Sequence, residues 1–169
     1  DDLVRRAVLE QVEDVPEKLV KPYTRLLKDS SFVNVEMALV NLVNSHPGQA
    51  NVFLDMTKDE TGWRGKNVRV KWLELTVQAG NKKYLDELIG YSDIRSYGFE
   101  TVKNALDAIY RLNYLDQVVA ANLLRASIYW NHKVARAAKV LIKDYMKITD
   151  YKEMIEKAFE TGAWEEGEE

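Results

Sequence analysis

The chain has 169 residues, of which 46% are hydrophobic and 30% are charged, so it can fold around a core as a globular domain. Its net charge of −3 provides no overall positive field, which argues against nucleic acid or an anionic membrane as a partner. The lack of cysteine excludes a disulfide framework, a Cys–zinc site and a thiol nucleophile, and no apolar run approaches the roughly 18 residues that span a bilayer.

Five stretches share a helical pattern that begins at a valine. In most copies apolar residues follow four and seven positions later, on one helix face, and a small residue follows three positions later. The valines are Val4, Val35, Val68, Val102 and Val134, at intervals of roughly 31 to 34 residues. The residues at the small position are Ala7, Ala38, Lys71, Ala105 and Ala137, so lysine replaces alanine in the third copy. We expect neighbouring helices to approach closely at these alanines.

A second set of helical patterns alternates with the first, at residues 16–28, 49–57, 81–91, 114–130 and 150–160. Stretches such as "NSHPGQ" (44–49) and "QAGNKK" (78–83) supply the turns between them. Four residues are expected to cap the helices that follow them, namely Ser31, Asn67, Ser96 and Asn131. The pattern predicts an all-α fold, an α-solenoid of about five HEAT-like or armadillo-like helical pairs within one domain of residues 1–169. An irregular helical bundle that imitates a period is the alternative.

The first helical pattern starts almost at once after Asp1, which is not a methionine. We therefore expect the chain to be part of a longer protein, and its localisation is left open. In a solenoid each pair buries its faces against its neighbours. The first helix, with Leu3, Val4 and Val8, is then expected to need a partner upstream.

Motifs for catalysis are absent from the sequence. His46 and His132 are the only histidines, and neither belongs to a close set of metal ligands, so a turn residue and a helix-start residue are the expected roles. The "GWRGK" stretch (62–66) ends in Gly-Lys but lacks the spacing and the hydroxyl residue of a phosphate-binding loop. We expect an exposed loop there.

Basic residues follow one side of the helical pattern that starts near 132, namely Lys133, Arg136, Lys139, Lys143 and Lys147. A second basic group lies on an early helix, Lys18, Lys21, Arg25 and Lys28. A solvated face is the common meaning of such runs, and an anion-binding stripe is the alternative. The chain ends in the acidic tail "EEGEE", which we expect to be frayed.

Two stretches resemble a known family. The runs "LLKDSSFVNVEMALVNL" (26–42) and "GKNVRVKWLEL" (65–75) are similar to the C-terminal helical region of gluzincin-type zinc aminopeptidases. "RVKWLEL" in particular resembles the leukotriene-hydrolase and aminopeptidase-B branch. The likeness extends in pattern over about residues 26 to 160 and in detail over these two stretches alone.

The resemblance implies a non-catalytic C-terminal domain that closes the substrate cavity and supplies substrate contacts. Zinc, the only cofactor implied, and the catalytic residues would belong to a separate upstream domain of the same polypeptide, because no zinc motif stands in this sequence. The expected partners are that catalytic domain and the peptide substrate, without nucleic acid or membrane. A stand-alone α-solenoid scaffold for a peptide or protein partner is the alternative, and an independent enzyme is the third class.

Arg95, in "SDIRSYGFETVKNAL", is the one candidate substrate-binding residue. In the resembling branch an Arg in the loop before the next helix meets the free carboxylate of a short peptide, and counting back from Leu106 places Arg95 there. A lysine common two places later is Tyr97 here, which departs from that pattern. The guanidinium suits the task because it can pair bidentately with a carboxylate. The alternative is a surface Arg paired with Asp93 or Glu100, or with nothing.

Overall fold

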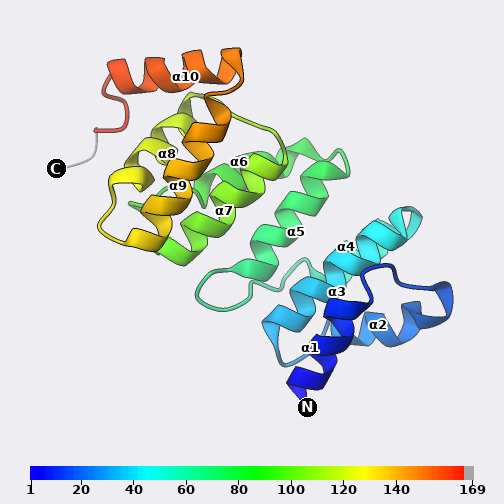
Figure 1. The fold of residues 1–169 in the computed structure, drawn as a ribbon. Helices are drawn as coiled ribbons and strands as arrows, with labels where there is room; N and C mark the ends of the chain where they lie inside the picture. The colour runs from blue at the N-terminus through cyan, green and yellow to red at the C-terminus, as the bar shows by residue number, and fades with distance from the viewer. Residues whose placement is uncertain (166–169) are drawn as a thin grey trace. The chain divides into compact units, whose positions relative to one another are not determined.

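The computed structural model describes residues 1–165, and every regular element in that part of the chain is helical (Figure 1). The all-α prediction is therefore confirmed. Residues 166–169, which hold most of the acidic tail, lie outside the described residues.

Every helix expected from the two alternating patterns is present. The first helices of the pairs are α1 (Asp2–Gln11), α3 (Phe32–Ser45), α5 (Asn67–Gln78), α7 (Phe99–Arg111) and α9 (His132–Tyr145). The second helices are α2 (Val20–Leu26), α4 (Ala50–Thr57), α6 (Leu85–Gly90), α8 (Gln117–Ile128) and α10 (Thr149–Glu160). A short 3₁₀ turn precedes three of them, at Glu17–Leu19, Pro47–Gln49 and Lys82–Tyr84.

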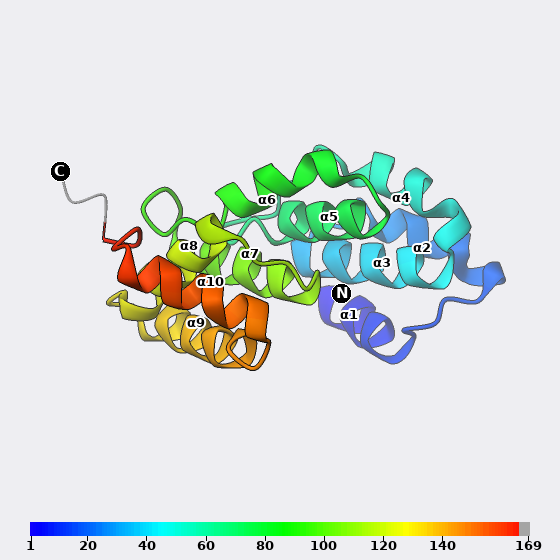
Figure 2. The same cartoon turned by 90° about the horizontal axis from the view of Figure 1, so that it is seen from above.

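The chain divides into two compact units, Asp1–Lys82 and Lys83–Glu169. In unit 1, α3 is central and contacts α1, α2, α4 and α5, and Figure 2 shows α1 and α3 side by side. Its apolar face is fully buried, with Val35, Leu39 and Leu42 in the core. The Asn41 amide also donates to the carbonyl oxygen of Leu9, at 3.0 Å, which ties the end of α1 to α3.

In unit 2, α7, α8 and α9 pack against one another, and α10 lies across α8 and α9. Leu106, Ile109 and Leu123 form part of the core, and the phenol of Tyr145 donates to the carbonyl oxygen of Tyr114 at 2.9 Å. The continuous solenoid and the single domain over residues 1–169 stay predictions.

The column of small residues is confirmed in part. Ala38 and Ala105 are completely buried, as a close helix contact requires. Ala7 is exposed and Ala137 is only half-buried, so the close helix contacts expected at these two positions are wrong. The apolar positions of the last copy, Val134, Ala138 and Leu141, are nevertheless buried as expected. A helix turns about 100° per residue, and with alanine at 135, 137 and 138 the sequence pattern could not choose among these faces.

Lys71 occupies the small-residue position of the third copy, and its side chain is not wholly buried. Its side chain is 17% exposed, and its ammonium lies 2.7 Å from the carboxylate of Glu74, which is buried. The stem of Lys71 therefore packs against the protein while its ammonium pairs with Glu74.

The first helix turns an apolar face away from the rest of unit 1. Leu3, Val4 and Val8 are 73%, 61% and 47% exposed, whereas Leu9, on the opposite side of α1, is buried. Arg5 and Asp29 form an ion pair that holds α1 near the start of α3, with Nε of Arg5 2.5 Å from the Asp29 carboxylate. The packing of α1 on α3 thus leaves its larger apolar face uncovered within the described unit.

Candidate functional site

Arg95 lies in the turn between α6 and α7, where it forms a closed pair with Asp93. The Arg95 side chain donates through Nε to Oδ1 at 3.0 Å and through Nη2 to Oδ2 at 2.8 Å. The backbone N–H of Arg95 donates to the same Oδ1 at 3.0 Å, as in an Asx turn. The pairing with Asp93 that the sequence left open is therefore present, and the Arg95 side chain remains 46% exposed.

This pair lines a pocket of about 520 Å³ within unit 2. The end of α6 and the following turn form one wall, and α8 forms the other. Its polar lining includes Asp93, Arg95, Ser96, Gln117, Asn122 and Arg125, and Ala163 closes one side. We call this the Arg95 pocket.

A hydrogen-bonded chain fixes Arg125 on the α8 wall. Its Nη1 donates to Oδ1 of Asn122 at 2.9 Å, and its Nη2 donates to the carbonyl oxygen of Ala163. The Asn122 amide donates in turn to Oγ of Ser92 at 2.8 Å, and Ser92 donates to the carbonyl oxygen of Ile89 at 2.6 Å. Asn122 and Ser92 are almost fully buried, so this network holds the second guanidinium of the pocket in one orientation.

The Arg95 pocket is lined by two positive groups, Arg95 and Arg125, and one negative group, Asp93. Its charged side chains therefore sum to one positive charge. Burial alone would raise the pKa of Asp93, but hydrogen bonds from Arg95 and the charges of Arg95 and Arg125 outweigh it and hold that pKa below its ordinary value. Asp93 is therefore an anion at neutral pH. The pocket can bind a small carboxylate between two guanidinium groups, in competition with Asp93.

Sequence reasoning missed Arg125 and Asn122. Both lie in "AANLLRASI", where an amide and a guanidinium interrupt an apolar helix. Polar side chains among buried positions need partners, so that interruption was the available signal. It could not show that the partners come from the α6–α7 turn and from Ala163.

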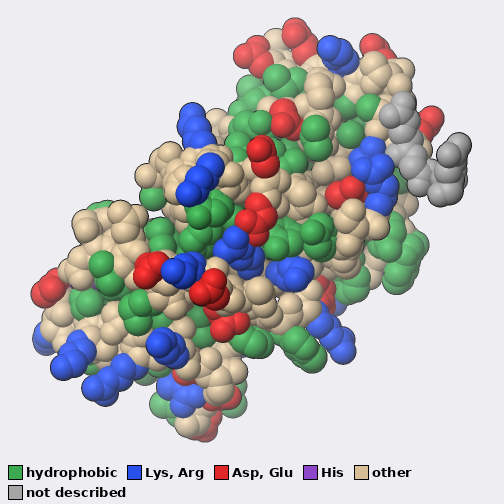
Figure 3. All heavy atoms as spheres, turned by 180° about the vertical axis from the view of Figure 1, so that it is seen from behind, with side chains coloured by type: hydrophobic (Ala, Val, Ile, Leu, Met, Phe, Trp, Pro, Cys, Tyr) green, Lys and Arg blue, Asp and Glu red, His purple; other side chains and the backbone are tan. Residues whose placement is uncertain are grey.

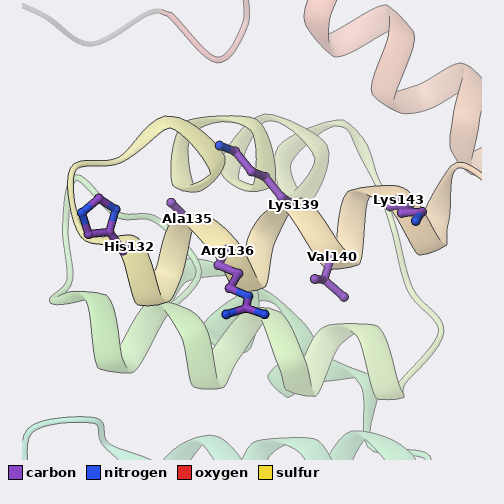
Figure 4. A pocket seen from close by; sticks show the side chains of 6 residues that line it. All are labelled: His132, Ala135, Arg136, Lys139, Val140 and Lys143. Carbon is purple, nitrogen blue, oxygen red and sulfur yellow. The ribbon is translucent and has the colours of Figure 1, made fainter.

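A second candidate lies on α9. A shallow depression of about 520 Å³ is lined entirely from this helix, by His132, Ala135, Arg136, Lys139, Val140 and Lys143 (Figure 4). We call these residues the α9 face. Arg136 lies on one flank of the face and Lys139 on the other. Of the predicted stripe, Lys147 lies beyond the end of α9 and pairs with Asp144 at 2.6 Å, so it is not part of this face.

The remaining candidates have simple structural roles. His46 lies in the turn between α3 and α4, where its Nε2 is 2.7 Å from the carbonyl oxygen of Val15, and His132 is the first residue of α9. The "GWRGK" stretch is a loop in which Arg64 lies over the exposed ring of Trp63. On the surface seen in Figure 3, acidic and basic side chains are interspersed.

Residues 1–165 contain neither a candidate group of metal ligands nor a candidate membrane-spanning helix. No three of their His, Asp and Glu side chains are grouped so that they could hold a metal ion. None of the helices in that range is both long and apolar enough to cross a bilayer. Comparison with known proteins finds no family model, no curated protein and no solved structure that matches this chain.

Proposed function

We propose that this chain is the non-catalytic C-terminal helical domain of a zinc metallo-aminopeptidase, which closes the substrate cavity and contacts the substrate through Arg95. The observation that supports the proposal is the Arg95 pocket, which is lined by Arg95 and by a second guanidinium, that of Arg125, held by hydrogen bonds. Zinc and the catalytic residues would reside in an upstream domain, so the chain alone is not expected to hydrolyse peptides.

The family named in this proposal comes from a sequence resemblance. The two stretches that resemble the gluzincin-type aminopeptidases fall on α3 and α5, which contact each other in unit 1. "RVKWLEL" forms most of α5, where Trp72 is buried and donates through its indole N–H to the carbonyl oxygen of Leu54 at 2.7 Å. The residues that carry the resemblance thus contribute to the core and would maintain the fold, whereas Arg95 would contact the substrate.

The α-solenoid belongs to the same proposal. Within unit 1 the first helices α1, α3 and α5 pack in sequence order, as the stacking of repeats requires. Within unit 2, α7 and α9 do the same. We propose that this stacking continues across residues 1–169 and that the uncovered face of α1 receives the upstream catalytic domain, because Leu3, Val4 and Val8 would lose their exposure to water there.

Replacing Arg95 in the full-length enzyme tests the proposal. Arg95→Ala should lower kcat/KM for short peptides with a free C-terminal carboxylate by roughly ten- to a hundredfold, through the loss of about 1.5–3 kcal/mol of charge-assisted hydrogen bonding. Peptides with an amidated C-terminus should be hydrolysed almost as before. Arg64→Ala, which removes a cation from the loop before α5, is the matched control. An equal loss for both kinds of peptide, or none for either, would exclude Arg95 as the carboxylate contact.

The alternative, a scaffold that binds a peptide or protein, has an observation of its own. The α9 face presents the basic side chains of Arg136, Lys139 and Lys143 to solvent. This surface is compatible with either function, because a domain of an enzyme can also bind a partner.

A further inference from the structure

Three lysines of unit 2 outside the α9 face pair with an acidic side chain, whereas the basic residues of that face do not pair with one among the described residues. Lys103 pairs with Asp107, Lys147 with Asp144, and Lys152 with Glu156, each three or four positions away. Residues 132–143 of α9 contain four cations, Lys133, Arg136, Lys139 and Lys143, and no acidic residue. Within residues 1–165, no ion pair joins these four cations to a carboxylate.

Three of these cations lie at neighbouring positions along the α9 face. Arg136 and Lys139 are three positions apart, and Lys139 and Lys143 are four, so each pair is adjacent on the helix surface. Like charges at these spacings are unfavourable in a helix. An anionic ligand on this face would therefore form ion pairs and offset the charge of neighbouring cations.

The length of the α9 face also suits a short segment of protein. From His132 to Lys143 it runs for roughly 17 Å along the helix axis, about three turns. Val140, which is 52% exposed, provides apolar surface between Lys139 and Lys143. Carboxylates with apolar residues between them match this order of charges, and Arg136 can bind a carboxylate through two parallel hydrogen bonds.

We propose that the α9 face is a docking site for an acidic segment of a protein, one that presents carboxylates along about three helical turns with apolar residues among them. A bilayer is a poorer match because the apolar side of α9, with Val134, Ala138 and Leu141, is buried in unit 2 and cannot insert. Nucleic acid is a poorer match because the chain as a whole carries a charge of −3, which opposes an extended polyanion.

Fluorescence anisotropy with the 169-residue chain tests the proposal. The probe is a labelled 14-residue peptide with Glu at every third or fourth position and leucines between, and the same peptide with Gln for Glu is its control. We expect saturable binding of the Glu peptide that weakens at least tenfold between 50 and 300 mM salt, and no binding of the Gln peptide. Absence of binding by the Glu peptide, or equal binding of both peptides, would overturn the proposal.

Lys139→Glu is the decisive variant. The new carboxylate lies three positions after Arg136 and four before Lys143, so it should pair with both and leave the melting temperature equal or higher. Binding of the Glu peptide should nevertheless weaken at least tenfold. Lys21→Glu, which makes the same charge change at an exposed site on α2, should bind as the parent chain does. Equal weakening in both variants would show a nonspecific effect of net charge and contradict the docking site.

A second variant and two further ligands complete the test. Arg136→Gln removes a cation without adding a carboxylate, and it should also weaken peptide binding severalfold. Vesicles containing phosphatidylserine and a 20-nucleotide single-stranded DNA serve as the other anions. Tighter binding to either of them than to the Glu peptide, lost in Lys139→Glu, would replace the acidic segment with a membrane or a nucleic acid.

Discussion

At the scale of single residues, the completely buried alanines mark where helices approach most closely. Ala105 on α7 has no exposed surface, so a longer side chain would have to displace its neighbours. Ala105→Leu should lower the free energy of unfolding by about 1–3 kcal/mol through overpacking. Ala137→Leu, at the half-buried position on α9, should change it by less than about 0.5 kcal/mol. Urea unfolding of both variants measures this, and an unchanged stability of Ala105→Leu would contradict the packing described for α7.

In the proposed role, Asp93 would compete with a substrate carboxylate for Arg95. Its two oxygens already accept hydrogen bonds from the Arg95 side chain, so a substrate must compete with them. Asp93→Asn keeps an oxygen for the backbone N–H of Arg95 but removes the competing charge. In the full-length enzyme we expect KM for peptides with a free C-terminus to fall severalfold while amidated peptides are unaffected. A rise in KM for the free-carboxylate peptides would indicate that Asp93 instead holds Arg95 in its active position.

At the scale of elements, hydrophobic periodicity was sufficient to predict the helices but not their ends. Of the four expected caps, Asn131 alone accepts a hydrogen bond from a helix N–H, that of Lys133 at 3.0 Å. Asn67 is the first residue of α5 and donates to Glu36 instead, and α7 starts after Gly98 rather than after Ser96. Helix ends depend on partners from other elements, which a local pattern does not contain.

The same limit applies to the candidate site. Arg95 could be singled out because a resemblance aligned it with a known role, and Asp93 could be suspected because it is two positions away. Arg125 reaches the pocket only through the packing of α8 against the α6–α7 turn, and the distance in sequence hides this contact. An apolar face of α1 without a partner in this chain was also expected. Which face of α1 packs on α3 was not predictable, because apolar residues lie around most of that helix.

The segment between α7 and α8 makes the stability of unit 2 sensitive to alkaline pH. Burial, together with the hydrogen bond from the Tyr114 phenol to Asp116 at 2.9 Å, raises the pKa of Tyr114 from 10.0 to about 12. A raised pKa means that the folded state retains this proton more strongly than the unfolded state does. The stabilisation is therefore complete below pH 10 and is lost as the pH rises towards about 12.

Urea unfolding between pH 9 and 11 should show this loss. Burial also raises the pKa of Tyr145, so the parent chain should lose stability steadily over the range. Tyr114→Phe cannot ionise at position 114 and should lose less. The same dependence on pH in the parent chain and in Tyr114→Phe would show that Tyr114 does not contribute.

At the scale of the whole molecule, we propose that this chain is a domain of a zinc aminopeptidase that does not contain the catalytic residues. The described residues provide a guanidinium pocket, a basic face on α9 and an uncovered apolar face on α1, and all three are suited to binding. The upstream polypeptide should accordingly encode an H-E-x-x-H helix followed by a further glutamate on the next helix.

Zinc content and aminopeptidase activity, measured side by side on the full-length protein and on residues 1–169, test this claim most directly. We predict about one zinc per chain in the full-length protein, with hydrolysis of a substrate that has a free N-terminus and loss of that hydrolysis on chelation. The 169-residue chain should contain no stoichiometric zinc and should not hydrolyse the substrate. A full-length protein without zinc and without aminopeptidase activity, or hydrolysis by residues 1–169 alone, would contradict the account.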